Sequence, residues 1–155
     1  MAEVLPLSES ELKLLDSLVR HQVNFMIVGL SAAALQGAPV VTEDVDLWFE
    51  NLNDPNLLAA LRGVGAAYVP PFGLNSPMLA GEGSEPFDVV LSMSGLRSFG
   101  EELAHTIEVQ LGTVTVKVLS LERILASKMA ADRAKDRLVI PVLKTTISTL
   151  RSKSE

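Results

Sequence analysis

The residues of this chain best suited to chemistry are three aspartates, Asp44, Asp46 and Asp88. Asp44 and Asp46 stand two apart in residues 43–50, where side chains alternate as in a β-strand. Carboxylates at that spacing project from one face, roughly 7 Å apart along the backbone. Their charges repel, and a bound Mg²⁺, which prefers carboxylate oxygens, relieves the repulsion. The pair indicates a metal site, although Asp-x-Asp alone favours an ordinary solvated strand face.

Asp88 is the candidate for a third metal ligand. It is the one acid within the apolar run Phe87–Leu91, which is expected to form another strand. A third carboxylate on a neighbouring strand would allow two metal ions about 3.5–4 Å apart, the arrangement used in phosphoryl transfer. The expected cofactor is therefore Mg²⁺ or Mn²⁺.

A glycine turn precedes the acidic strand. The apolar run Phe25–Val28 predicts a buried strand that ends at Gly29, and Ser31 is expected to cap a short helix closed by Gly37 and Pro39. Free backbone N–H groups at a helix N-terminus bind phosphate. The turn is thus a candidate nucleotide site, and the alternative is an ordinary strand-to-helix connection.

Lys128 is expected in a helix capped by Ser120, on the same face as the apolar stripe of that helix. A lysine there either extends past the edge of the core or points into a site. Asp132 and Asp136 follow at i+4 and i+8, so the three could form one line on a continuous helix. The pattern alone favours two surface ion pairs worth about 0.2–0.5 kcal/mol each.

The elements that must position these residues follow from capping and alternation patterns. Helices first and last, with hairpin and crossover connections between them, predict an α+β (mixed α/β) domain whose mixed sheet is flanked by helices. A chain of 155 residues without a long linker fits one domain, residues 1–155. The remaining expected elements are a capped helix from Ser8 to about Gln22, a helix from Pro55 to about Arg62, loops over 63–86 with one edge strand near 67–69, a short helix over 97–104, a hairpin around Gly112, and a last helix interrupted or restarted at Pro141.

Charge is distributed unevenly along the chain. Residues 1–120 hold five Lys and Arg against fifteen Asp and Glu, whereas residues 121–155 hold eight against four. A metal site facing a polyphosphate site would produce this division, and so would a solvated basic helix. The net charge of −6 argues against a protein that coats nucleic acid through bulk electrostatics.

Composition excludes several other classes. The chain has no cysteine, and therefore neither disulfides nor thiolate metal sites. No stretch approaches the roughly 20 apolar residues that cross a bilayer, so no membrane partner is expected. Met1–Val4 lacks the features of a signal peptide, and a cytoplasmic location is the default expectation.

The order of these motifs resembles the start of a DNA polymerase β-type nucleotidyltransferase domain. The resemblance covers about residues 10–145 and extends to small bacterial members, the abortive-infection-type nucleotidyltransferases and related toxin–antitoxin proteins. The motifs that carry it are Val28-Gly29-Leu30-Ser31-Ala32, Thr42-Glu43-Asp44-Val45-Asp46-Leu47, Phe87-Asp88-Val89-Val90, Val118-Leu119-Ser120-Leu121-Glu122, Lys128 and Arg133-Ala134-Lys135-Asp136.

The resemblance implies a nucleotidyltransferase fold and a metal-dependent transfer of a nucleoside monophosphate from an NTP to an RNA (such as tRNA) or protein hydroxyl. It also implies that a toxin–antitoxin partner could bind the chain. Its motifs assign metal binding and catalysis to Asp44, Asp46 and Asp88, and Asp88 would also activate the acceptor. They assign nucleotide binding to Gly29, Ser31 and Thr42. They assign a phosphate contact or catalytic support to Lys128.

Two positions depart from the family pattern. Leu30 stands where a small residue is usual, and Val40 stands where an arginine is frequent. Loss of a fixed cation weakens phosphate binding. An alternative hypothesis is therefore a degenerate binding module or antitoxin-like partner that keeps the fold without the chemistry. A third is an unrelated α+β domain with surface acids, in which Asp88 would lie far from Asp44 and Asp46.

Overall fold

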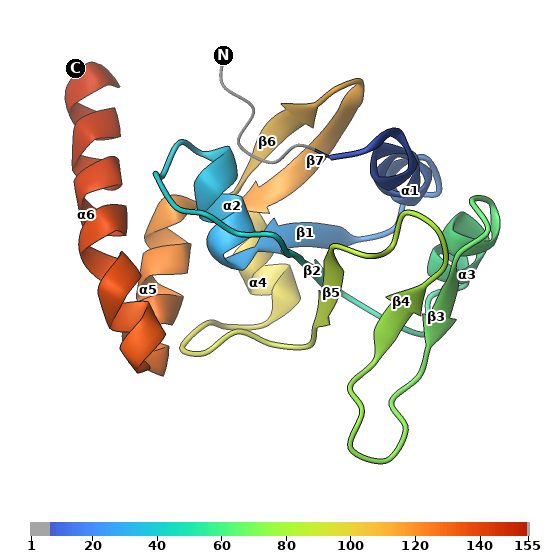
Figure 1. Cartoon of the computed structure of the whole chain (residues 1–155). Helices are drawn as coiled ribbons and strands as arrows, with labels where there is room; N and C mark the ends of the chain where they lie inside the picture. Colours follow the sequence, from blue (N-terminus) through green and yellow to red (C-terminus); the bar gives the residue numbers. More distant parts are fainter. Residues whose placement is uncertain (1–6, 155) are drawn as a thin grey trace.

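The structure is a computed structural model that describes residues 7–154. Met1–Val4, on which the expected lack of a signal peptide rests, lies outside the described residues. A mixed sheet forms the centre of the molecule, helices flank it, and a small β-hairpin stands to one side (Figure 1). The expected mixed α/β domain with helices around a mixed sheet is confirmed.

The main sheet has five strands in the order β5-β2-β1-β7-β6. The pairs β5–β2 and β1–β7 are parallel, whereas β2–β1 and β7–β6 are antiparallel. Every residue of β1 is buried, as its uninterrupted apolar sequence predicts for a central strand. The strands are β1 (Phe25–Val28), β2 (Val45–Phe49), β5 (Phe87–Val90), β6 (Thr106–Leu111) and β7 (Val114–Leu119).

Helix starts follow the capping signals of the sequence. Ser8 and Glu11 form a complete capping box, Asp54 caps the third helix ahead of Pro55, and Ser120 caps the fifth. Helix α1 packs on β7 and α3, and α2 packs on β1, β2 and α5. The helices are α1 (Glu9–Arg20), α2 (Gly29–Leu35), α3 (Pro55–Arg62), α4 (Phe99–Glu102) with the 3-10 turn η1 (Leu103–His105), α5 (Leu121–Ala131) and α6 (Ala134–Ser154).

Residues 63–86 contain more regular structure than their glycine and proline content suggests. The strand β3 (Ala67–Val69) is present where it was expected, but it is not an edge of the main sheet. It pairs antiparallel with β4 (Met78–Ala80) in a separate two-stranded sheet. The strand β4 was not expected because Pro77 and Gly81 border three residues too few to show an alternation pattern.

The expected interruption at Pro141 is wrong, because α6 runs through it from Ala134 to Ser154. The break lies at Asp132, whose left-handed backbone (φ 49°) ends α5 and turns the chain back. Leu143 and Ile147 are buried, and α6 packs along α5 through this face. Packing against α5 therefore keeps α6 helical across the exposed Pro141, although the proline has no N–H to donate and one backbone hydrogen bond is lost.

The core fills the space between the sheet and the helices. Trp48 is buried and meets Phe99 of α4 edge-on, with 5.7 Å between ring centroids, so it packs the core. Within residues 7–154, no helix combines the length and the apolar character needed to cross a membrane.

Candidate active site

The aspartates Asp46 and Asp88 lie side by side on neighbouring strands. Asp46 is the second residue of β2, and the parallel register pairs it directly with Asp88 of β5. Neighbouring strands are about 4.8 Å apart. Asp44 lies immediately before β2, in the segment that leads into the strand, and is exposed. The interpretation in which Asp88 lies far from the pair is therefore excluded.

The surroundings of the two paired carboxylates disfavour their ionised forms. Burial raises the pKa of Asp46, the charge of Asp88 raises it further, and Lys128 works in the opposite direction. Burial also raises the pKa of Asp88, and the charge of Asp44 adds to that effect. Both shifts mean that burial and the neighbouring acids outweigh the nearby lysines and disfavour the ionised carboxylates, a condition that a bound metal would relieve.

Gly29 makes room for the Asp46 carboxylate. Its backbone is left-handed (φ +70°), a conformation that glycine adopts without a steric penalty. A Cβ built on Gly29 would overlap the Oδ2 atom of Asp46. The glycine at the end of β1 is therefore required by the position of the acid as well as by the turn.

Ser31 does not cap α2, contrary to the expectation from the sequence. The N-cap lies three residues earlier, at Val28, and no side-chain hydrogen bond caps the helix there. The fully buried Ser31 hydroxyl donates to the Val28 carbonyl oxygen (2.8 Å) and accepts from the Asp46 N–H (3.3 Å). It thus supplies the acceptor for a backbone donor of β2 and ties Asp46 to the turn.

Thr42 organises the approach to β2. Its hydroxyl accepts from the Asp44 N–H (3.3 Å) and donates to the Asp44 carbonyl oxygen (3.1 Å). Of the two residues that depart from the family pattern, Val40 packs against the core and Leu30 is partly buried in α2. An apolar side chain at position 40 therefore serves packing.

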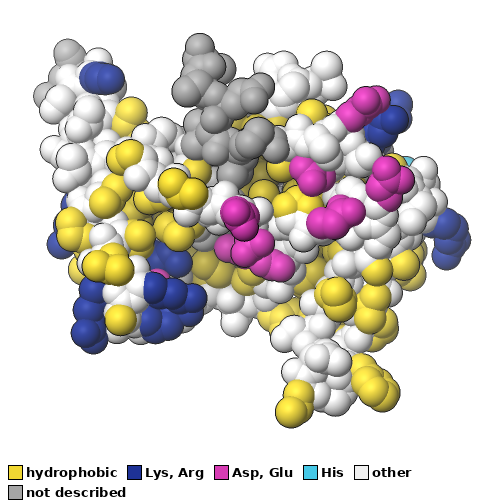
Figure 2. All heavy atoms as spheres, in the orientation of Figure 1, with side chains coloured by type: hydrophobic (Ala, Val, Ile, Leu, Met, Phe, Trp, Pro, Cys, Tyr) yellow, Lys and Arg dark blue, Asp and Glu magenta, His cyan; other side chains and the backbone are white. Residues whose placement is uncertain are grey.

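A cleft of about 310 Å³ brings the acid together with three basic residues. Asp46 and Gly29 line one side, and Lys128, Arg133 and Lys135 line the other. In Figure 2, acidic side chains gather near the middle of the face, and Lys and Arg side chains gather where α5 and α6 meet. The cleft therefore offers one carboxylate, that of Asp46, and three cations to a single ligand.

Lys128 reaches this cleft from α5 and does not form the expected line with Asp132 and Asp136. The helix ends before that line can form, and Asp132 pairs instead with Arg137 at 2.8 Å. The Lys128 Nζ atom lies 3.5 Å from an Asp136 carboxylate oxygen across the junction of the two helices. The lysine side chain is only 14% exposed, so the pair is a tertiary contact rather than a surface pair.

Asp136 contacts two of the three basic residues of the cleft, Lys128 and Arg133. Its side chain is 1% exposed and accepts from the Arg133 backbone N–H (3.1 Å) and Nε atom (2.7 Å). Hydrogen bonds from Arg133, helped by the charge of Lys128, lower the pKa of Asp136 to about 2. The carboxylate therefore stays ionised and fixes both cations.

The sequence did not single out Arg133 and Lys135 as site residues, because the run from Arg133 to Arg137 resembles a solvated helix face. The signal that could have found them is the aspartate in that run. An acid three residues after Arg133, at the third helical position, is placed to reach back to the start of α6.

The donor set fits a hard divalent cation. Within residues 7–154, no group of three or more His, Cys, Asp or Glu side chains forms a complete metal cage. Mg²⁺ does not need one, because it is usually held by one or two carboxylates together with water and substrate phosphates. Asp46 and Asp88 supply two carboxylates on adjacent strands, next to a cleft that suits phosphates.

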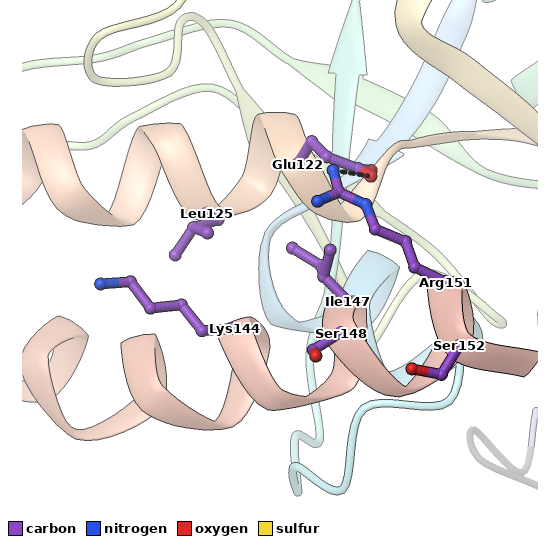
Figure 3. Close-up of a pocket in the computed structure, with 7 residues that line it drawn as sticks. All are labelled: Glu122, Leu125, Lys144, Ile147, Ser148, Arg151 and Ser152. Carbon is purple, nitrogen blue, oxygen red and sulfur yellow. Dashed lines mark ion pairs between the residues drawn. The ribbon is translucent and has the colours of Figure 1, made fainter.

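A second cavity, of about 370 Å³, lies between α5 and α6 on the far side of their junction. Figure 3 shows its lining, with Arg151 directed at Glu122, 3.7 Å away. None of the residues that the sequence assigned to catalysis or nucleotide binding lines this cavity.

Comparisons with known proteins identify the fold. No family model and no curated protein sequence matches the chain, whereas solved structures do. The antibiotic-resistance factor ANT(2″)-Ia, in complex with adenylyl-2″-tobramycin, has a TM-score of 0.56 and 14% identity, covering 92% of this chain and 95% of that one. Its solution structure gives a TM-score of 0.57 at 14% identity, covering 94% and 91%.

An antigenic nucleotidyltransferase-like protein from Paracoccidioides brasiliensis has a TM-score of 0.50 and 20% identity, covering 96% of this chain and 90% of that one. All three comparisons span nearly the whole of both chains. The chain therefore has the nucleotidyltransferase fold, as the resemblance implied. At these identities the comparisons establish the fold and leave the chemistry to the site itself.

Proposed function

We propose that this chain, on its nucleotidyltransferase fold, is a metal-dependent enzyme that transfers a nucleoside monophosphate from an NTP to a hydroxyl group. The observation that carries the proposal is the cleft in which Asp46, paired with Asp88, faces Lys128, Arg133 and Lys135. Isolated carboxylates or an isolated basic helix would each have an ordinary structural explanation. The meeting of Asp46 with three cations at one cleft matches the charges of a metal–triphosphate complex.

Each residue then has a defined task. Asp46 and Asp88, with Asp44 beside them, would hold Mg²⁺ or Mn²⁺, and the metal when bound would neutralise charge on the phosphates. Lys128, Arg133 and Lys135 would bind the phosphates that leave as pyrophosphate. Gly29 leaves room for the Asp46 carboxylate. Ser31 holds the backbone N–H of Asp46, and Thr42 holds that of Asp44.

The proposed reaction forms one bond and breaks one. The acceptor hydroxyl oxygen bonds to the α-phosphorus of the NTP, and the bond from that phosphorus to the bridging oxygen of the β-phosphate breaks. Asp88, the more exposed of the paired carboxylates, takes the hydroxyl proton and passes it to water. Pyrophosphate leaves with the electron pair of the broken bond, stabilised by the cations of α5 and α6.

Binding of Mg²⁺–NTP, measured by calorimetry with each of the four NTPs, is the first test. Binding of at least one NTP is expected, with Lys128→Met weakening it at least about tenfold through loss of a partly buried phosphate contact. Lys144→Met is the control, since Lys144 is an exposed lysine on α6 outside this cleft.

Transfer is tested with α-labelled NTP and hydroxyl-bearing acceptors, with pyrophosphate release as a second readout. Asp46→Asn should abolish transfer, whereas Glu50→Gln, which neutralises an exposed acid just after the same strand, should leave it intact. Tight NTP binding without any transfer would favour the degenerate binding module instead. Equal transfer by Asp46→Asn and the unaltered protein would refute the catalytic proposal.

A further inference from the structure

A second space adjoins the paired carboxylates on the side away from the basic cleft. It is a groove of about 620 Å³ between β4 and β5, and Asp88 lines it. Asp46 lines the basic cleft and not this groove, whereas its partner Asp88 lines the groove and not the cleft. The two carboxylates therefore stand between two separate binding spaces, one of which carries the cations for a nucleotide.

The groove is bounded by strand edges. Its lining includes the consecutive residues 76–81 on one side and 87–89 on the other. Successive side chains of a strand point to opposite faces of the sheet, so consecutive residues can line one groove only along the edge of a strand. β5 is the last strand of the main sheet and β4 pairs only with β3, within the part of the chain that the structure describes. In Figure 1 the two strands lie side by side and open away from their connection. An open strand edge accepts an extended peptide.

The charge around the groove selects against a polyanion. Residues 63–96 contain neither lysine nor arginine, while Glu85 and Asp88 line the groove and Glu82 lies in the connection between its strands. Nucleic-acid binding depends on lysine and arginine at the phosphates. A ligand with positive charge is favoured here instead.

The β3–β4 hairpin adds apolar surface. Met78 lines the groove and is 52% exposed, and Phe72 and Leu74 near the hairpin tip are more exposed still. Figure 2 shows hydrophobic side chains protruding at this tip. Exposed large apolar side chains beside a polar groove are typical of a protein-binding surface.

We propose that the groove between β4 and β5 is the acceptor site and that its ligand is an extended cationic peptide segment, which presents a Ser, Thr or Tyr hydroxyl to Asp88. This proposal rests on the proposed nucleotidyl transfer and narrows its acceptor to protein. The hydroxyl oxygen becomes bonded to the α-phosphorus and pyrophosphate leaves, as in the reaction above. Nucleotide and acceptor would enter from opposite sides of the carboxylate pair.

The test uses the full chain and a peptide of roughly ten residues, enough to run along one strand edge, with alternating Lys and Val and one central Tyr. Its binding is measured by calorimetry in the absence of nucleotide, and its labelling is measured with α-labelled NTP and Mg²⁺. Glu85→Lys, which reverses an exposed charge in the groove, should weaken peptide binding about tenfold or more. Glu50→Lys is the matched control at an exposed acid outside the groove and should leave peptide binding unchanged.

Two competitors separate the acceptor classes. A peptide with Glu in place of each Lys should neither bind nor become labelled, and total RNA should not displace the cationic peptide. Equal binding of the acidic peptide, displacement by RNA, or indifference to Glu85→Lys would overturn the proposal. A hydroxyl-bearing small cation that is labelled while the peptide is not would overturn it as well.

The proposed function is tested separately by Mg²⁺–NTP binding. Glu85→Lys should leave NTP affinity unchanged, because Glu85 lies outside the basic cleft. NTP binding without peptide binding overturns the acceptor proposal alone. Peptide binding without NTP binding overturns nucleotidyl transfer, and with it the role of the groove as an acceptor site.

Discussion

At the scale of single residues, the site depends on one close approach between backbone and side chain. The Asp46 carboxylate lies against the Gly29 backbone, while Ser31 holds the Asp46 N–H from the other side. The acid is thus placed by a glycine that makes room for it and a serine that holds its backbone. Its ionised form is disfavoured by burial and by Asp88, and the proposed metal would counter both effects.

Gly29→Ala is expected to destabilise the fold and displace the acid. The left-handed backbone penalises alanine by about 1–3 kcal/mol, and the new methyl group also collides with Asp46. Gly37→Ala is the matched control, because Gly37 is also left-handed but has no atom within 4 Å of the added Cβ. Urea unfolding of both variants should show a larger loss for Gly29→Ala, and only that variant should lose Mg²⁺–NTP binding. Equal losses would show that the approach of Asp46 to Gly29 is unimportant.

At the scale of elements, the junction of α5 and α6 creates the basic side of the cleft. Asp132 ends α5 in a left-handed conformation, and α6 restarts two residues later with Asp136 reaching back to Arg133. The turn brings Lys128 of one helix beside Asp136 of the other. A continuous helix would have placed these residues on an exposed line, away from a common ligand.

Asp136 should make stability depend on pH in the acid range. Its pKa is lowered from 3.8 to about 2 in the folded chain, so the ionised carboxylate stabilises the fold fully above pH 3.8. That contribution, about 1–2 kcal/mol after allowance for the exposed Arg133 partner, is lost as the pH falls towards 2.

The measurement is the urea midpoint of the unaltered protein and of Asp136→Asn from pH 7 to pH 2. Asp136→Asn should be less stable near neutrality, and the difference should shrink as the pH falls. Asp132→Asn removes the neighbouring but exposed partner of Arg137 and should change stability by less than about 1 kcal/mol. A difference for Asp136→Asn that stayed constant down to pH 2 would contradict the assigned role.

At the scale of the whole molecule, opposite charges converge from distant parts of the chain. The acids come from β2 and β5, and the cations come from α5, α6 and the junction between these helices. The acceptor side carries no cation from residue 63 to residue 96. The molecule therefore has a basic side, where we propose that the polyphosphate binds, and an acidic side, where we propose that the acceptor binds.

NTP affinity should fall with ionic strength, because the cations of the cleft attract a highly charged ligand. Raising the salt concentration from about 0.05 M to about 0.3 M should weaken Mg²⁺–NTP binding by about three- to tenfold. Lys135→Gln should reduce the slope of this dependence, whereas Lys144→Gln should not. An identical slope in all three proteins would exclude Lys135 from phosphate binding.

Much of this fold could be read from the sequence because it depends on local signals. The capping box at Ser8, the proline after Asp54 and the alternation around Gly112 each act within a few residues, and each predicted its element correctly. The order of the motifs also predicted the nucleotidyltransferase fold. The predicted cap at Ser31 and the predicted interruption at Pro141 were wrong because tertiary contacts override the local preference. The Ser31 hydroxyl accepts from the Asp46 N–H, and packing against α5 keeps the helix continuous at Pro141.

The sequence by itself determined which residue types are present for chemistry: three aspartates, a lysine on an otherwise apolar helix face, and a basic C-terminal third. Only the tertiary structure decided which of them meet. Strand register pairs Asp46 with Asp88, and the turn at Asp132 brings Arg133 and Lys135 to the cleft that Asp46 lines. The physical reason is that periodicity and capping act over a few residues, whereas charges on separate elements meet only after packing fixes the register of the strands and the angle between the helices.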